Sequence, residues 1–161
     1  MKIILGLGNP GVEYTNTRHN AGIIFVDNFS QKLSSPYRWR REKNKMIFKS
    51  DEFTLIKTAT VFMNESGNLL TSPANLYVAH DDLDIKLGQF KIQKGVKPKL
   101  HYGVESVENT LKTKDFWRIR IGIDNRTTPI DGETYVLQKF TPEEKVILEN
   151  TLDAIIKTIN R

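Results

Sequence analysis

A dense set of polar side chains follows the first apolar run of the chain. Residues 3–22 read IILGLGNPGVEYTNTRHNAG, in which Asn9 and Tyr14 precede the sequence TRHN. His19 stands where a helix is expected to begin, and a helix N-terminus disfavours the charged imidazolium. A neutral imidazole is what a general base requires. The alternative interpretation is a helix-start histidine that bonds the backbone of the loop.

A histidine base needs a neighbour that holds its tautomer, which is usually a carboxylate. The sequence VAHDDLD places Asp81, Asp82 and Asp84 directly after an expected strand. Asp81 and Asp82 are adjacent, so in an extended chain they point to opposite sides and one of them can face the site. Carboxylates crowded at a strand end also form turns and caps, and we predict no metal site here.

A third polar group comes from the sequence TVFMNESGN, in which Asn64 follows two apolar residues. Asparagine is a good N-cap, so Asn64 could begin a short helix. Its amide could instead turn toward a substrate. The two roles compete for one side chain.

The glycines of the first segment have the spacing of a dinucleotide-binding fingerprint, G-x-G-x-x-G, at Gly6, Gly8 and Gly11. That fingerprint needs a helix that starts at the loop and an acid about 20 residues further on, at the end of a second strand. Pro10 disfavours helix in the residue before it, and Asp27 falls inside an expected helix. The sequence therefore does not predict a nucleotide site at these glycines.

The elements that must position these side chains follow from the periodicity of the chain. Apolar runs and alternating apolar and polar residues predict strands. Apolar residues at helical spacing, and a capping box at Thr141, predict helices. The predicted strands and helices alternate along the chain. This pattern predicts an α/β fold, a three-layer αβα sandwich with a mixed, mostly parallel central sheet, in one domain over residues 1–161. The expected strands are 2–5, 45–50, 53–59, 75–79, 89–93 and 117–124, and the expected helices are about 19–33, a short one after Asn64, 103–111 and one that follows Thr141.

Composition narrows the class of function. The chain has 161 residues and no cysteine, which excludes disulfides, thiolate metal sites and cysteine nucleophiles. Its N-terminus is neither a signal peptide nor a membrane span, so we expect a cytoplasmic protein. Lys and Arg number 24 against 19 acids, a net charge of +5, and the excess gathers in residues 37–49 and 91–101. Two such clusters favour a nucleic-acid partner.

Several blocks of the sequence together resemble bacterial-type peptidyl-tRNA hydrolases. They are GLGNPGVEYTNTRHNAG, TVFMNESG, VAHDDLD, FWRIRIGID and YVLQKFTPEE. The resemblance implies hydrolysis of the ester between a peptide and the 3′ ribose of tRNA, which returns tRNA to translation after stalling. It implies no metal and no organic cofactor, and a monomer that binds the acceptor stem and 3′ end of peptidyl-tRNA.

The resemblance also implies roles for individual residues. His19 would activate water, and Asp81 would orient His19. Asn9 would recognise the peptide, Asn64 would hold the peptide backbone or the water, and both would act beside the base. The resemblance further implies that side chains around them line the site and that lysines contact tRNA phosphates: Tyr14, Phe62, Met63 and Tyr102, and Lys94, Lys97 and Lys99.

This chain departs from the family pattern at one site position. Where the family has G-H-N-G, the chain reads His101-Tyr102-Gly103, so a tyrosine replaces the asparagine. Tyrosine donates one hydrogen bond and can stack on a base, but it lacks an amide. This leaves a second interpretation, an RNA-binding relative with weakened catalysis. The segment before VAHDD and the C-terminal end also look shorter than in the family.

Overall fold

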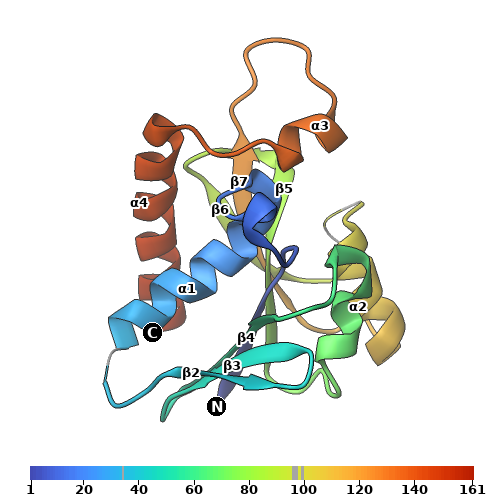
Figure 1. The fold of residues 1–161 in the computed structure, drawn as a ribbon, viewed down its shortest axis with the longest axis vertical. Helices are drawn as coiled ribbons and strands as arrows, with labels where there is room; N and C mark the ends of the chain where they lie inside the picture. The colour runs from blue at the N-terminus through green and yellow to red at the C-terminus, as the bar shows by residue number, and fades with distance from the viewer. Residues whose placement is uncertain (34, 96–97, 99) are drawn as a thin grey trace.

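The structure is a computed structural model that describes residues 1–33, 35–95, 98 and 100–161. Seven strands form one sheet in the order β2-β3-β4-β1-β5-β7-β6 (Figure 1). The four central strands pair in parallel, and β3 and β6 run antiparallel to their neighbours. The strands are β1 (Lys2–Gly6), β2 (Trp39–Glu42), β3 (Lys45–Lys49), β4 (Phe53–Thr58), β5 (Leu76–Lys86), β6 (Phe90–Lys94) and β7 (Trp117–Asp124).

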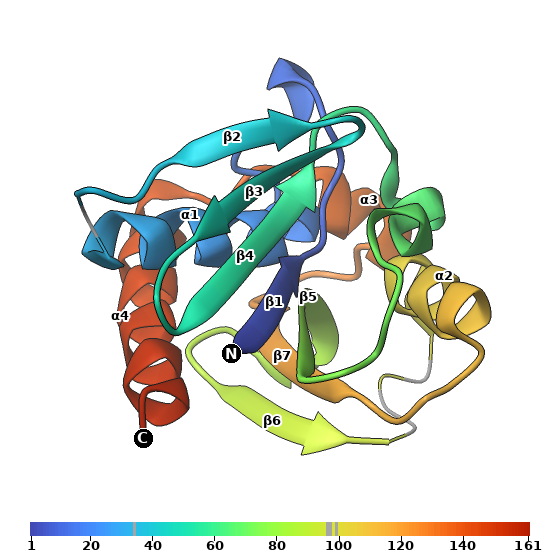
Figure 2. The ribbon, with the colours of Figure 1, turned by 90° about the horizontal axis from the view of Figure 1, so that it is seen from below.

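Helices cover both faces of the sheet, which confirms the predicted three layers (Figures 1 and 2). On one face, α1 (Ala21–Leu33) and α4 (Pro142–Ile159) bury Phe25, Phe29 and Leu152 against the sheet. On the other face, α2 (Tyr102–Leu111) and the 3-10 helix η3 (Met63–Leu69) bury Val104 and Val107. The remaining elements are α3 (Gly132–Leu137) and the 3-10 turns η1 (Val12–Tyr14) and η2 (Arg18–Asn20). Among the described residues, no helix is long and apolar enough to cross a membrane.

The glycines of the first segment allow close packing at the end of β1. A Cβ on Gly6 would collide with the carbonyl of Gly22, and one on Gly22 would collide with the carbonyl of Ala79 and the backbone of Leu7. The Leu7 N–H donates to Ala79 O at 2.9 Å, and the Ile23 N–H donates to Leu7 O at 3.2 Å. Because these side chains are absent, α1 can start directly against β1 and β5.

Two expectations about elements need correction, and two elements have no counterpart in the sequence predictions. The strand expected over 75–79 continues to Lys86, so the acids lie inside β5 rather than after it. Asn64 does not cap a helix, because η3 already includes Met63 and its N-cap is Phe62. The segments that became β2 and α3 were not predicted. Strand β2 is the charged sequence WRRE at the sheet edge, and α3 has six residues behind an Asp131 cap.

Candidate active site

A cavity of about 770 Å³ lies beyond the carboxyl end of β1 and beside the second half of β5. This is where open α/β sheets place their binding sites. Five residues predicted for the site line the cavity, namely Asn9, Tyr14, His19, Asp81 and Tyr102. The rest of its lining is Asp82, Leu83, Asp84, Pro98, Leu100, His101, Gly132, Glu133, Val136 and Leu137.

The structure brings the predicted base and its predicted partner into contact. Nδ1 of His19 lies 2.9 Å from Oδ2 of Asp81, which is almost fully buried. An ionised carboxylate can only accept, so Nδ1 of His19 carries the proton and Nε2 keeps its lone pair. Burial disfavours the imidazolium, but attraction to Asp81 and the hydrogen bond with it more than offset this and raise the pKa of His19.

His101 is the residue of this cluster whose role sequence reasoning missed. Its Nε2 lies 2.8 Å from Oδ1 of Asp81, so one carboxylate bonds two imidazoles. Its Nδ1 accepts from the backbone N–H groups of Gly103 at 3.1 Å and Val104 at 3.3 Å, which makes His101 the N-cap of α2. An acceptor at Nδ1 requires the neutral tautomer with its proton on Nε2. His101 therefore donates to Asp81 and links it to α2.

The charge of Asp81 is maintained by these two rings. Burial opposes ionisation of the carboxyl, but the positive potential and the hydrogen bonds of His19 and His101 hold the pKa of Asp81 well below its usual range. Asp81 is thus a carboxylate at neutral pH, as the tautomer of His19 requires.

The same three residues are the group whose spacing could hold a metal ion, with ligand atoms within 4.8 Å of one another. Their contacts of 2.8 and 2.9 Å are hydrogen-bond distances. Nδ1 of His101 already accepts from two N–H groups, so the proton of the ring is on Nε2. A metal ion bound to Nε2 would have to displace that proton, and no proton would then remain on either ring nitrogen. The donor set therefore fits a hydrogen-bonded cluster better than a metal centre.

Asn9 is held with a defined amide orientation. The Asn20 side chain accepts from the Asn9 N–H at 2.8 Å and donates to the Asn9 carbonyl at 3.0 Å. Oδ1 of Asn9 accepts from the Met63 N–H at 2.7 Å. The Nδ2 amino group of Asn9 has no protein partner within the described part of the chain, so it is available as a donor.

The other predicted contacts around the base lie in two different environments. Phe62 is 48% exposed and packs edge-on against Tyr14, with ring centroids 6.0 Å apart. Met63 is buried in the core beneath α2, and only its backbone reaches Asn9. Asn64 is exposed, and no hydrogen bond of its side chain occurs among the described residues. These three residues do not line the cavity as the structure stands.

Tyr102 and Lys94 follow the acids of β5 along the chain. Tyr102 is the first residue of α2 and is 56% exposed. Lys94 ends β6, where its Nζ lies 3.4 Å from Asp115 and 5.5 Å from the ring centroid of Trp117. Lys97 and Lys99 lie outside the described residues.

Asp82 has a different partner from Asp81, although both residues line the cavity. Its Oδ2 accepts from Nε of Arg120 at 2.8 Å, and both side chains are buried. Next to the Asp82–Arg120 ion pair, burial lowers the pKa of His80 to about 3, so His80 is neutral at neutral pH. Of the two adjacent carboxylates, Asp81 therefore bonds His19, and Asp82 forms a buried ion pair with Arg120.

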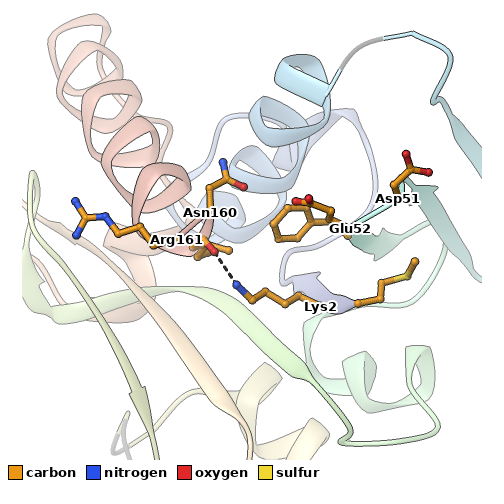
Figure 3. A pocket seen from close by; sticks show the side chains of 8 residues that line it. Lys2, Asp51, Glu52, Asn160 and Arg161 are labelled. Atoms are coloured by element: carbon orange, nitrogen blue, oxygen red, sulfur yellow. Dashed lines mark hydrogen bonds between the residues drawn. The ribbon is translucent and has the colours of Figure 1, made fainter.

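A second cavity, of about 340 Å³, lies at the opposite end of β1 (Figure 3). Lys2, Asp51 and Glu52 border it, and Nζ of Lys2 donates to the carbonyl of Ile159 at 2.7 Å. This cavity adjoins the first residues of β1, whereas the His19 cavity adjoins the strand's carboxyl end. The grouping of a base, a carboxylate and an amide is found in the His19 cavity.

Comparisons with known proteins agree on one family. The family model described as peptidyl-tRNA hydrolase matches residues 3–161. A peptidyl-tRNA hydrolase of Desulfitobacterium hafniense (strain Y51) is 35% identical over 169 residues, covering 99% of this chain and 91% of that protein. One of Mycoplasmopsis agalactiae is 38% identical over 164 residues, covering 96% and 85%. The crystal structure of the peptidyl-tRNA hydrolase from Acinetobacter baumannii matches with a TM-score of 0.87 and 25% identity, covering 99% and 87%.

Proposed function

The chain belongs to the peptidyl-tRNA hydrolase family and hydrolyses peptidyl-tRNA, and we propose that His19 is the general base of that reaction. The observation that carries this proposal is the 2.9 Å contact between Nδ1 of His19 and Asp81. That contact assigns the lone pair to Nε2, on a ring that lines the cavity.

In the proposed reaction, Nε2 of His19 takes a proton from water while the water oxygen attacks the ester carbonyl of the substrate. Asp81 stabilises the imidazolium that forms. When the tetrahedral intermediate collapses, the bond from the carbonyl carbon to the ribose oxygen breaks. The imidazolium then returns its proton to that oxygen, which yields tRNA and the free peptide acid.

We assign recognition of the peptide to Asn9. Its Oδ1 is occupied by the Met63 N–H, so Nδ2 is the group that can donate to a peptide carbonyl. An aminoacyl ester without a peptide has no such carbonyl, which gives Asn9 a means of discrimination. The exposed Asn64 amide, on the segment beside Met63, would donate to the substrate or to the oxyanion.

We place the 3′ end and acceptor stem of the tRNA beside α2 and β6. Tyr102 and Phe62 have exposed rings, and Tyr14 packs against Phe62. These three residues would contact the terminal nucleotide or the peptide, because aromatic rings stack on bases and the two tyrosines can also form hydrogen bonds. Lys94, and with it Lys97 and Lys99, would contact phosphates. The proposed unit is a monomer with one domain over residues 1–161, working in the cytoplasm without an added cofactor.

The test of the base is His19→Asn with an N-acetylaminoacyl-tRNA substrate under single-turnover conditions. General-base assistance contributes about 10²–10⁴-fold, so we expect the rate to fall by that order. Circular dichroism and thermal unfolding should show an intact fold. A variant that keeps its rate within a few-fold of the unsubstituted protein would rule out His19 as the base.

A further inference from the structure

The residue directly before His19 is a buried arginine. Arg18 is 5% exposed, and Nη2 donates to Oε1 of Glu144 at 2.7 Å. Nη1 donates to the carbonyl of Tyr135 at 3.2 Å and to Oε1 of Gln138 at 3.1 Å. The guanidinium carbon stacks over the Tyr135 ring, 3.9 Å from its centroid.

All three partners come from one stretch, residues 135–144, with the sequence YVLQKFTPEE. The same stretch also bonds the backbone around Arg18. The Arg18 N–H donates to Gln138 O at 3.0 Å, and the Phe140 N–H donates to Asn16 O at 3.0 Å. Thr17 and Lys139 form an isolated antiparallel bridge. The stretch that begins in α3 and ends in α4 is therefore joined to the turn that carries His19.

The partners of Arg18 are themselves fixed to the end of β7. Oε2 of Glu144 accepts from Asn125 at 3.0 Å, while its Oε1 also accepts from the Thr141 N–H at 3.0 Å. The Tyr135 hydroxyl donates to the Ile123 carbonyl at 2.9 Å. The side chains of Glu144 and Tyr135 are thus held in place by the end of β7 and by Thr141, independently of their contacts with the Arg18 guanidinium.

We propose that Arg18 is a positioning residue for catalysis, which fixes the turn carrying His19 to the α3–α4 segment that walls the cavity. Gly132, Glu133, Val136 and Leu137 of α3 line the same cavity as His19. Arg18 does not line the cavity itself, but it fixes the position of the His19 turn on one side of the cavity relative to the α3–α4 segment on the other side. The inference rests on the proposed role of His19 as the base.

Stability alone is a weak explanation for this ion pair. Burying two charges removes their hydration, and well-packed apolar residues often serve stability as well or better. The specific gain from a guanidinium is its geometry, since one planar group bonds three acceptors and stacks on a ring. The requirement for such geometry points to positioning.

The decisive variant is the double substitution Arg18→Met/Glu144→Gln, which removes both charges together. The amide oxygen of the new glutamine can still accept from the Thr141 N–H, and its amino group can donate to Asn125 once the Asn125 amide turns its oxygen inward. We expect thermal unfolding to change little and kcat on N-acetylaminoacyl-tRNA to fall about 10- to 100-fold, as displacement of a catalytic group by about 1 Å can cause. KM should stay within about threefold. NMR of the His19 ring should show a lowered pKa, because its contact with Asp81 loosens.

Arg126→Met is the matched control. Arg126 also lies over the Tyr135 ring, 5.4 Å from its centroid, and bonds Asp124 and the Ile130 carbonyl. It makes no contact with the turn of His19 within the described residues, so kcat should be unchanged. If the double variant does not fold, Arg18→Lys decides, since it keeps the ion pair but loses the planar fork and the stack. We expect kcat of Arg18→Lys to fall by a smaller factor.

The outcomes separate this inference from the proposed function. An unchanged kcat and an unchanged His19 titration in a folded Arg18 variant would overturn positioning and leave the base assignment standing. An equal loss in Arg126→Met would also overturn it, because any large side chain around Tyr135 would then matter alike. Full turnover by His19→Asn would instead remove the base assignment itself.

Discussion

At the residue scale, the site depends on one carboxylate that accepts from two rings. Oδ2 of Asp81 meets Nδ1 of His19, and Oδ1 meets Nε2 of His101. The second nitrogens of the two rings differ. Nδ1 of His101 accepts from backbone N–H groups, whereas Nε2 of His19 has no hydrogen-bond partner among the described residues and can take a proton. The same carboxylate therefore supports one ring in catalysis and another in structure.

The pH dependence of activity follows from the His19 contact. A base acts when it is neutral, so kcat/KM should rise with pH through the pKa of His19, which lies above the ordinary 6.5. In Asp81→Asn the attraction is lost while burial remains, so the acid limb should move to lower pH and kcat should fall. Rate–pH profiles from pH 5 to 9 check both. An acid limb that stays in place in Asp81→Asn would contradict the assignment.

Residues 18–20 and 80–82 show how much of the site could be predicted from the sequence. His19 and Asp81 could be proposed as candidates because polar residues gather beyond two apolar runs, and the family resemblance implied the roles of His19, Asp81 and Asn9. The roles of His101 and Arg18 could not be predicted, because their contacts join residues 20 and 126 positions apart with no periodic pattern. Such contacts depend on how the strands are ordered, which local patterns do not specify.

At the scale of elements, α2 is joined to the catalytic carboxylate through its own N-cap. His101 accepts from two N–H groups of the first turn of α2 and donates to Asp81. The start of α2 also carries Tyr102, which lines the cavity. The position of this helix and the position of the carboxylate are thus set by one ring.

Two substitutions can separate these two functions of His101. In His101→Asn, the side-chain oxygen lies near the place of Nδ1 and can still cap α2, but Asp81 loses its donor. In His101→Gln, the amide nitrogen lies near the place of Nε2 and can still donate to Asp81, but the cap is lost. We expect His101→Asn to lose activity, and His101→Gln to keep most activity while its unfolding free energy falls by about 0.5–2 kcal/mol.

Single-turnover rates and urea unfolding of both variants measure this separation. Equal rates in the two variants would show that the contact with Asp81 does not matter for catalysis. Leu111→Ala, at the other end of α2, serves as a control for general loosening of the helix.

Elements with a strong local pattern were predicted, and those that depend on distant partners were not. β7 alternates Ile119, Ile121 and Ile123 with arginines, and α4 has a capping box, so both could be recognised. β5 continues through its acids because Asp81 finds two imidazoles and a guanidinium pairs with Asp82. Without those partners, buried carboxylates would end the strand, which is what the sequence alone suggested.

At the scale of the whole molecule, the sheet separates the two basic segments of the chain. Strands β2 and β3 and the turn between them contain residues 39–49 of the segment 37–49, and β6 contains the first four residues of the segment 91–101. The order β2-β3-β4-β1-β5-β7-β6 places them at opposite edges of the sheet. Both edges are charged, and charge on an edge strand also prevents unwanted pairing with other chains. If the tRNA binds along one edge of the sheet, the charge on the other edge would act only to prevent pairing with other chains.

The salt dependence of binding decides which edge the tRNA follows. We expect Lys94→Ala to lower the slope of log affinity against log salt concentration by about 0.7–0.9, the share of one phosphate contact. The measurement is the Kd of N-acetylaminoacyl-tRNA for His19→Asn from 50 to 200 mM KCl, so that turnover does not interfere. Arg40→Ala is the matched control at the other edge, since both cations are exposed and each pairs with one acid.

A reduced slope in Arg40→Ala alone would move the acceptor stem to the β2–β3 edge. Reduced slopes in both would require a substrate surface that spans the sheet, whereas an unchanged slope in Lys94→Ala would show that Lys94 makes no phosphate contact.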